Sequence, residues 1–491
     1  MVSYRKCLAC LLVAGAISPA VFLLSVLIQY AGTVFPPGID QPLKARICQT
    51  MFVTGLILVC VEGRATGCMT TLKCKLCLTS TYKRHRAWVV TPRCPFFHSE
   101  GPSTCCGYHA GLGIPTLCSK ILRWSPKIKF SSSVLCQQGI ILEELGLCSI
   151  LDVLRLWTTG VPPCRDPSLV IQNQKFDGVP VRIYSSRTVP TRKRKAVLYF
   201  HGGAGVFGSI DAYERVLRHM AKEGDATVVA VGYGLAPENP YPNQYTECLK
   251  AAVYLMKHAE DYGIDGSRII ISGDSCGANF ATRVCQLLVD RRDLPKVHAQ
   301  ALIYPGLQAM DLSLPSYQQN CRSPLLWRKI VAYFCCRYLN KPTSFINDLL
   351  KSSHVPKATR LKYQKWVNAN NIPEQFKVRG YTEQDHSLSN FNPQLYEEMK
   401  EMLSETFSPL LAEDEVVCKL PQTFLLTCEF DVLRDDGLLY MKRLMDNGVP
   451  VTWSHVENGM HGIMPLFGYG ILSFPSAKRA AHDVTDFIRR L

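Results

Sequence analysis

A run of three isoleucines, Ile269 to Ile271, leads almost directly into the pentapeptide Gly273-Asp274-Ser275-Cys276-Gly277. This stretch constrains the chain more than any other, because an apolar run followed by helix-compatible residues predicts a buried strand, a tight turn and a helix. Gly-x-Ser-x-Gly at such a turn is typical of an exposed nucleophilic serine in strained backbone geometry. A Cβ atom at Gly273 or Gly277 would crowd the neighbouring strand or helix. The pentapeptide by itself is also compatible with an ordinary glycine-rich loop.

Three further stretches favour the nucleophile interpretation. Upstream, residues 196–200 predict a buried strand that ends at His201-Gly202-Gly203-Ala204-Gly205, whose small residues let backbone N–H groups face a carbonyl oxygen. Downstream, residues 423–430 predict another buried strand, with Asp431 at its C-terminal end. A third strand, 451–456, is followed by a loop that carries His461. The order Ser, Asp, His along the chain is typical of hydrolases built on a mainly parallel sheet.

These motifs together resemble those of the hormone-sensitive-lipase-like serine hydrolases, and within them the arylacetamide deacetylase-like proteins of the like-4 type. The resemblance covers residues 1–58 and 139–491 and implies an α/β-hydrolase fold with no cofactor and no metal ion. The sequence departs from the family pattern at Ala204, where a third glycine is common, and at Gly234, where an arginine is common. Alanine still offers its amide, so the first departure leaves an oxyanion hole intact.

The expected catalytic residues are Ser275 as nucleophile, His461 as base and then acid, and Asp431 to orient the imidazole. Asp435 is the alternative to Asp431, although it falls inside the next helical pattern. Cys276 is expected to contribute only its amide and a small packing side chain.

The expected oxyanion hole consists of the amides of Gly203, Ala204 and Cys276, with Gly202 allowing close approach. We expect His201 to shape its loop and His455, on a strand, to be structural.

Strand and helix patterns alternate along much of the chain, which predicts an α/β fold with a mainly parallel central sheet and helices on both faces. Asp177-Gly178 predicts a hairpin at the sheet edge. The alternation fails between Pro305 and Leu420, which we interpret as a helical cap. The expected domains are a signal anchor at 1–29, an N-terminal cap region at 30–160, the hydrolase core at 161–305 and 421–491, and a second cap segment at 306–420.

The N-terminal segment from Cys7 to Ile28 is almost wholly apolar and follows Arg5 and Lys6. About twenty such residues can span a bilayer. A cleaved signal peptide is the alternative, but no clear cleavage site follows. We therefore expect an uncleaved signal anchor with its positive flank in the cytoplasm, which places the catalytic domain in the lumen of the endoplasmic reticulum.

Residues 59–138 have a different composition from the rest of the chain. They contain nine of the 22 cysteines and eleven Lys or Arg residues against two acidic residues, so they carry most of the net charge of +15. No sustained periodicity is present, and the concentration of charge in this segment argues against a nucleic-acid partner. We interpret it as an intron-like insert, because Val59 and Gln138 fit codons at splice boundaries. Cys74-x-x-Cys77 with nearby histidines offers zinc ligands as an alternative, but the spacing is not that of a zinc module.

The leading hypothesis is a membrane-anchored hydrolase of carboxylic esters or amides with lipophilic acyl groups. A catalytically silent, membrane-tethered lipid-binding protein on the same fold is the alternative. A dinucleotide-binding oxidoreductase is disfavoured, because no Gly-x-Gly-x-x-Gly follows a strand. The oligomeric state and the particular substrate are left open by the sequence.

Overall fold

The structure is a computed structural model. It describes residues 166–188, 193–384, 391–470 and 473–491, together with a few isolated positions: Gly38, Leu151, Leu154, Arg155, Thr158 and Pro163. The expected signal anchor and the expected insert at 59–138 lie outside the described residues, as does nearly all of the N-terminal cap region. No helix in the described part of the chain is long and apolar enough to cross a membrane.

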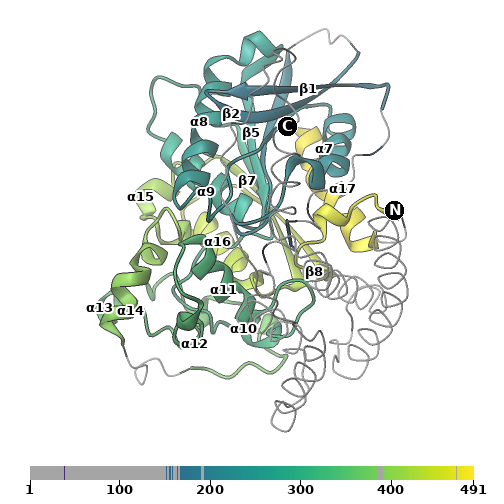
Figure 1. Cartoon of the computed structure of the whole chain (residues 1–491). Coiled ribbons are helices and arrows are strands. Elements are labelled where there is room, and N and C mark those ends of the chain that lie inside the picture. Colours follow the sequence, from purple (N-terminus) through teal and green to yellow (C-terminus); the bar gives the residue numbers. More distant parts are fainter. Residues whose placement is uncertain are drawn as a thin grey trace, which may run out of the picture.

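The described residues form one eight-stranded sheet with the order β1-β2-β4-β3-β5-β6-β7-β8 (Figure 1). Strand β2 pairs antiparallel with β1 and β4, and all other pairings are parallel, which confirms the predicted fold class. The strands are β1 (Leu169–Phe176), β2 (Val179–Ser186), β3 (Arg194–Phe200), β4 (Thr227–Val231), β5 (Ile264–Asp274), β6 (Ala299–Ile303), β7 (Gln422–Phe430) and β8 (Val451–Met460).

The predicted hairpin at Asp177-Gly178 is confirmed at the edge of the sheet. Phe176 pairs with Val179 across a two-residue turn. Asp177 has a φ of 46° and Gly178 a φ of 85°, and two successive positive φ values are the signature of the tight hairpin turn that matches strand twist.

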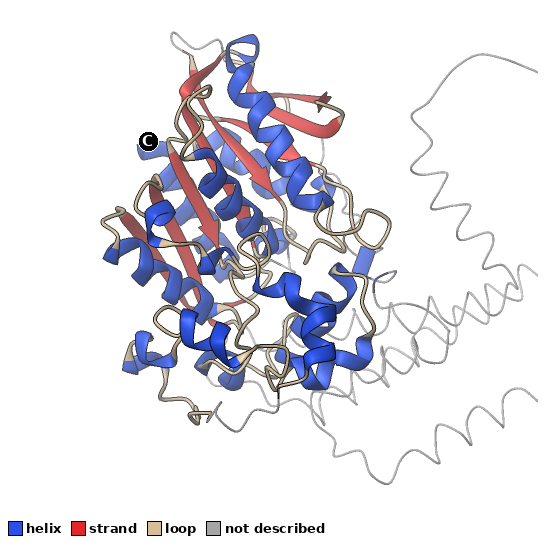
Figure 2. Ribbon diagram, turned by 90° about the vertical axis from the view of Figure 1, so that its left-hand side faces the viewer, coloured by secondary structure: helices blue, strands red, loops and turns tan. Residues whose placement is uncertain are grey.

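The main helices lie on both faces of the sheet (Figure 2). Helices α7 (Ile210–Glu223) and α17 (Pro475–Arg490) pack in one hydrophobic cluster, whereas α8 (Asn243–Lys257), α9 (Cys276–Leu288) and α16 (Arg434–Asp446) pack in another. Side chains alternate across a strand, so Val197 and Tyr199 of β3 face the first cluster and Leu198 and Phe200 face the second. Burial on both faces explains why the parallel strands are nearly continuous apolar runs.

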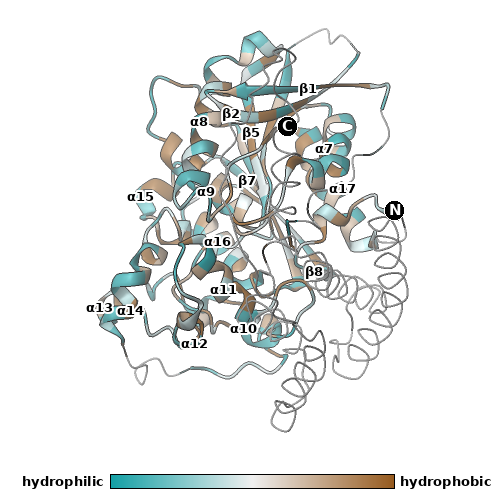
Figure 3. Ribbon diagram, viewed as in Figure 1, coloured by the Kyte–Doolittle hydropathy of each residue, from teal (hydrophilic) through white to brown (hydrophobic). Residues whose placement is uncertain are grey.

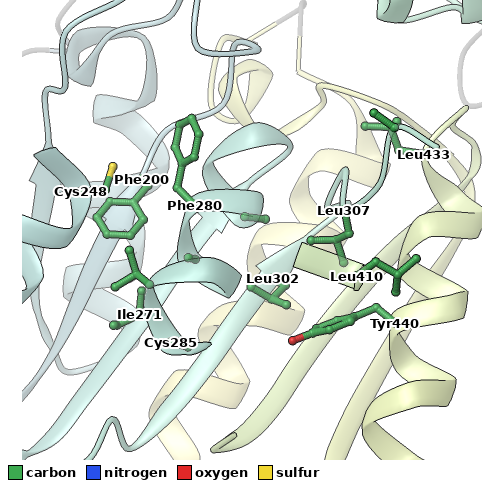
Figure 4. Packing of buried hydrophobic residues seen from close by; sticks show 14 of the residues in the cluster. Phe200, Cys248, Ile271, Phe280, Cys285, Leu302, Leu307, Leu410, Leu433 and Tyr440 are labelled. Carbon is green, nitrogen blue, oxygen red and sulfur yellow. The ribbon is translucent and has the colours of Figure 1, made fainter. Parts of the chain in front are cut away.

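The surface helices pack on the sheet through an apolar stripe. Figure 3 shows that helices such as α7 carry both polar and apolar residues, as expected when one stripe packs on the core and the other faces water. Ser209 caps α7 by accepting the N–H of Ala212. Figure 4 shows part of the buried cluster on the other face, where Ile271 and Leu302 lie on strands and Tyr440 on α16.

The chain between β6 and β7 forms short helices in its described residues and contributes no strand to the sheet. These helices are α10 (Pro315–Gln319), α11 (Arg328–Tyr338), α12 (Ile346–Leu349), α13 (Lys357–Tyr363), α14 (Pro393–Met399) and α15 (Asp414–Val417). The excursion lies where the sequence patterns place the second cap segment, 306–420, and its role as a cap stays a prediction.

Candidate active site

Ser275 occupies the tight turn between β5 and α9, which we call the serine elbow. Its φ of 56° and ψ of −123° are strained for a residue with a side chain. A Cβ atom on Gly273 would lie 2.4 Å from the backbone of Gly277, and one on Gly277 would lie 2.1 Å from the carbonyl oxygen of Phe200. The two glycines are therefore required by close backbone approach, as the sequence predicted.

The structure brings Ser275, His461 and Asp431 into one hydrogen-bonded series. His461 Nε2 lies 2.9 Å from Ser275 Oγ, and His461 Nδ1 lies 2.7 Å from Asp431 Oδ2. A carboxylate only accepts, so Nδ1 carries the proton and Nε2 is left to accept from the serine hydroxyl. The other two members of the series are buried, with Asp431 at 0% and His461 at 6% exposure.

Three parallel strands deliver these side chains to the same edge of the sheet. Ser275 directly follows β5, Asp431 directly follows β7 and His461 directly follows β8. The carboxyl ends of parallel strands point the same way, so residues far apart in sequence meet at this edge. The backbone N–H of Leu433 donates to Asp431 Oδ1 at 2.8 Å and fixes the orientation of its carboxylate.

Asp435, the alternative to Asp431, is directed elsewhere. It lies in the first turn of α16 and accepts the N–H of Ser316 at 2.6 Å. It also pairs with Arg434 at 3.0 Å, and both side chains are fully buried. Asp435 thus joins a buried ion pair and has no hydrogen bond to His461 among the described contacts.

The loop after β3 lies beside the elbow and has an unusual backbone. Gly203 has a φ of 116° and Ala204 a φ of 53°, which is the left-handed region. The carbonyl of Gly203 accepts the N–H groups of Val206 and Phe207, both at 3.0 Å, so the loop curls tightly. Gly202 donates its own amide N–H to Asp274 at 2.7 Å, so this amide does not serve as an oxyanion donor. The contribution of Gly202 is the close backbone approach that the absence of a side chain allows.

Cys276 is the first residue of α9, where backbone N–H groups have no partner within the helix. Its amide therefore lies at the electropositive end of the helix, next to the nucleophile. Burial raises the pKa of the Cys276 thiol to about 12, so the thiol stays neutral at physiological pH. It is no rival nucleophile to Ser275.

Asp274 is a residue of the site that the sequence interpretation missed. Its buried carboxylate accepts from Gly202 and from the hydroxyl groups of Tyr199, Tyr213 and Tyr304, at 2.7 to 3.1 Å. Burial raises the pKa of Asp274 to about 6 in spite of these four donors. The available signal was a carboxylate at the end of a buried apolar strand, which needs several donors to be tolerated there.

His201 and His455, the two other histidines considered for the site, have structural positions, as expected. His201 is buried, contacts the carbonyl of Gly202 through Nδ1 at 2.7 Å, and stacks on Tyr233. Burial lowers the pKa of His201 to about 4, so it stays neutral. His455 contacts Thr427 and Glu429 on the neighbouring strand.

A largely apolar cavity of about 110 Å³ opens at Ser275. Its walls come from the elbow, from α9, from the segment after β6 and from α11 of the cap segment. Tyr338 of α11 also packs on the loop after β3, residues 201–205, which we call the oxyanion loop. A Cβ atom on Gly205 of this loop would lie 2.6 Å from the ring of Tyr338. The lining residues are Ala204, Ser275, Cys276, Asn279, Phe280, Gly306, Gln308, Ala309, Tyr317, Leu326, Val331, Phe334, Cys335, Tyr338, Thr406, Phe407 and Leu433.

The parallel sheet and the serine elbow at its carboxyl edge define an α/β-hydrolase. A family model for the alpha/beta hydrolase fold matches residues 197–363 and 353–465. Among solved structures, a thermostable esterase from Pseudomonas putida superposes with a TM-score of 0.52 at 22% identity, covering 72% of this chain and 95% of that one. An esterase from Rhizomucor miehei gives 0.51 at 22% identity, covering 69% and 90%. At these identities the likeness shows the fold alone.

Sequence comparison gives a finer assignment. Human arylacetamide deacetylase-like 4 is 41% identical over 351 residues, which are 72% of this chain and 86% of the relative. Human arylacetamide deacetylase-like 3 is 39% identical over 354 residues, with the same two shares. Rat arylacetamide deacetylase is 35% identical over 338 residues, covering 67% and 84%. The chain belongs to the arylacetamide deacetylase-like proteins, and it is a hydrolase of the serine esterase class.

Proposed function

We propose that this enzyme cleaves carboxylic esters or amides through an acyl-enzyme formed on Ser275. The observation that carries the proposal is the pair of contacts at His461, 2.9 Å to the serine hydroxyl and 2.7 Å to the carboxylate of Asp431. A serine is a weak nucleophile until a base removes its proton, and His461 is in position to do so.

In the first half of the reaction, Ser275 Oγ attacks the carbonyl carbon while His461 Nε2 takes the hydroxyl proton. Asp431 stabilises the imidazolium that forms. The amides of Gly203, Ala204 and Cys276 are proposed to hold the oxyanion, and each such donor is typically worth about 10² to 10³ in turnover. His461 then protonates the leaving alcohol or amine, and a water molecule repeats the sequence on the acyl-enzyme to release the acid.

The cavity beside Ser275 supports a small, lipophilic acyl group. Aromatic and aliphatic side chains such as Phe280, Phe334 and Leu433 dominate its lining. Its volume of about 110 Å³ is below the ~150 Å³ of an engineered cavity that holds one benzene ring. A short aliphatic acyl group is therefore the best fit, and the names of the relatives support amide as well as ester substrates.

We further propose that residues 1–29 anchor the enzyme in the membrane of the endoplasmic reticulum, with the catalytic domain in the lumen. Support comes from the basic pair Arg5 and Lys6 before one apolar segment of bilayer length. N-glycosylation sites engineered into exposed loops, for example near Glu374 and Asp446, test this arrangement. Modification at both is expected, and lack of modification at both would place the domain in the cytosol.

The direct test of the reaction compares Ser275→Ala with Ser272→Ala on p-nitrophenyl butyrate. Ser272 lies three residues earlier, and its hydroxyl donates to the carbonyl of Ala301 inside the sheet. Turnover should vanish in Ser275→Ala and persist in Ser272→Ala. Turnover by purified Ser275→Ala at the wild-type rate would refute the assignment.

A further inference from the structure

Asp436 of α16 gathers hydrogen-bond donors from the two segments that line the cavity at Ser275. Its Oδ2 accepts the backbone N–H groups of Leu307 at 2.9 Å and Gln308 at 3.3 Å. Its Oδ1 accepts Nε2 of Gln308 at 3.0 Å, and the hydroxyl of Tyr317 lies 3.3 Å from Oδ1 and 3.4 Å from Oδ2. The carboxylate is fully buried, so these donors replace all of its water.

The donors belong to residues that form the cavity. Gln308 and Tyr317 both line it, and Gln308 is flanked by the lining residues Gly306 and Ala309. Both polar atoms of the Gln308 side chain are hydrogen-bonded: Nε2 donates to Asp436, and Oε1 accepts the N–H of Asp311 at 2.8 Å. The wall of the cavity after β6 and the first cap helix are thus tied to a single carboxylate.

Asp436 also lies on the segment that carries the proposed catalytic carboxylate. Asp431 precedes it by five residues, and Leu433 between them lines the cavity. A Cβ atom on Gly306 would lie 3.1 Å from Leu433, so the wall and the start of α16 pack directly on one another. Asp436 therefore sits where the acyl cavity is fixed relative to the catalytic residues, without touching Ser275 or His461 in any described contact.

We propose that Asp436 is a positioning residue that sets the width of the acyl cavity and thereby the preference of the enzyme for short acyl groups. With the carboxylate in place, the segment from Leu307 to Ala309 and Tyr317 stay close to α16 and the cavity stays small. Without it, buried N–H donors lose their acceptor and the wall moves to find new partners. The inference rests on the proposed function, because it assumes that this cavity receives the acyl group.

The ionisation of Asp436 predicts that the acyl preference depends on pH. Burial raises the pKa of Asp436 to about 7. Among the described residues, the titratable groups that interact with it include Tyr317 of α10, Cys335 of α11 and Asp435 on its own helix. Leu307 and Gln308 offer only N–H groups to it, so a protonated Asp436 can donate its new proton only to the hydroxyl of Tyr317. Acyl preference should therefore change as the pH crosses about 7.

The test measures kcat/KM for p-nitrophenyl acetate, butyrate and octanoate between pH 6 and pH 8.5. Taking the ratio of octanoate to butyrate for each enzyme cancels every pH effect that is common to both esters. Asp436→Asn is compared with Asp446→Asn, a change at the exposed end of the same helix where, among the described residues, the carboxylate pairs with Lys442. Labelling of Ser275 by a small fluorophosphonate reports that each variant has a working nucleophile.

The ratio of kcat/KM for octanoate to that for butyrate should rise about tenfold in Asp436→Asn at pH 8. One or a few methylene groups in an apolar pocket change kcat/KM by factors in this range. The pH dependence of the ratio should be lost in Asp436→Asn and kept in Asp446→Asn. Equal ratios in wild type and Asp436→Asn, with Ser275 labelled in both, would overturn the role of Asp436 alone. Failure to label wild-type Ser275 would instead overturn the proposed function.

A second variant covers the case in which Asp436→Asn does not fold. Tyr317→Phe removes one donor and leaves the carboxylate with its three N–H partners. It should shift the ratio in the same direction by about threefold, since one of four donors is lost. An unchanged ratio in a well-folded Tyr317→Phe would contradict the proposal.

Discussion

The carboxylate of Asp274 accepts the backbone N–H of Gly202 at 2.7 Å, so the residue before the serine elbow also holds the beginning of the oxyanion loop. The same carboxylate accepts the hydroxyl of Tyr304, whose oxygen in turn accepts the N–H of Met464. Met464 is three residues beyond His461, and the ring of Tyr304 packs against that of His461. One buried group therefore connects the loop after β3, the turn that holds Ser275 and the loop after β8 that carries His461.

Replacing Asp274 by Asn should lower kcat by about 10² with little change in KM, because the amide group turns a donor toward other donors and the oxyanion loop loses its fixed position. The rate of fluorophosphonate labelling at Ser275 should fall by a similar factor. Asp265→Asn, near the other end of β5, is the matched control, since that half-buried carboxylate accepts hydrogen bonds from Ser267 and lies away from the site. Wild-type turnover in Asp274→Asn would show that the loop holds itself in place.

Asp431→Asn and Asp435→Asn should fail in different ways. Asn at 431 offers His461 the wrong hydrogen-bonding partner, which misorients the base, and kcat should fall by about 10⁴. Asn at 435 leaves the buried guanidinium of Arg434 with less opposite charge, so the free energy of unfolding should fall by about 3 kcal/mol. Urea unfolding and ester kinetics on both variants separate the two effects. A greater loss of kcat in folded Asp435→Asn would reverse the assignment.

Ala204→Gly should stabilise the protein slightly. Ala204 has a φ of 53°, a left-handed conformation that costs a residue with a side chain about 1 to 2 kcal/mol. Glycine relieves this cost but loses more entropy on folding, so a net gain of about 0.5 kcal/mol is expected. Turnover should be kept, because glycine retains the amide. Ala358→Gly, inside exposed helix α13, should instead destabilise by about 1 kcal/mol. Thermal unfolding that ranked the two variants the other way would contradict the strain at Ala204.

We propose that residues 59–138 form no part of the hydrolase, and that deleting them, with Leu58 joined to Gly139, gives more soluble and more active enzyme. The sequence on either side of the segment predicts one continuous helix when Leu58 is joined to Gly139, and an insertion within a helix breaks its hydrogen-bond ladder. In the oxidising lumen that we propose for the domain, nine extra thiols would form wrong disulfides. The measurement is the yield of fluorophosphonate-reactive protein per cell from each form. An inactive deletion beside an active full-length chain would make the segment a functional element.

The sequence predicted the parts of the site that follow from local patterns. Gly273 and Gly277 mark a tight turn at the end of an apolar strand, and Asp431 and His461 each follow a recognisable strand, so their meeting follows from the parallel sheet. Asp274 and Asp436 were not predicted as parts of the site. Their donors lie far away along the chain, as with Tyr199 at 75 residues and Leu307 at 129 residues. No periodicity in the sequence specifies which distant donors surround a buried carboxylate.

We propose Ser275 as the nucleophile in the active site of this α/β-hydrolase. The most direct measurement is treatment of the purified enzyme with a fluorophosphonate probe, followed by peptide mass spectrometry to locate the adduct. We predict one adduct on Ser275, complete loss of ester turnover on labelling, and no adduct in Ser275→Ala. Equal labelling of wild type and Ser275→Ala, or an adduct on another residue with turnover lost, would contradict it.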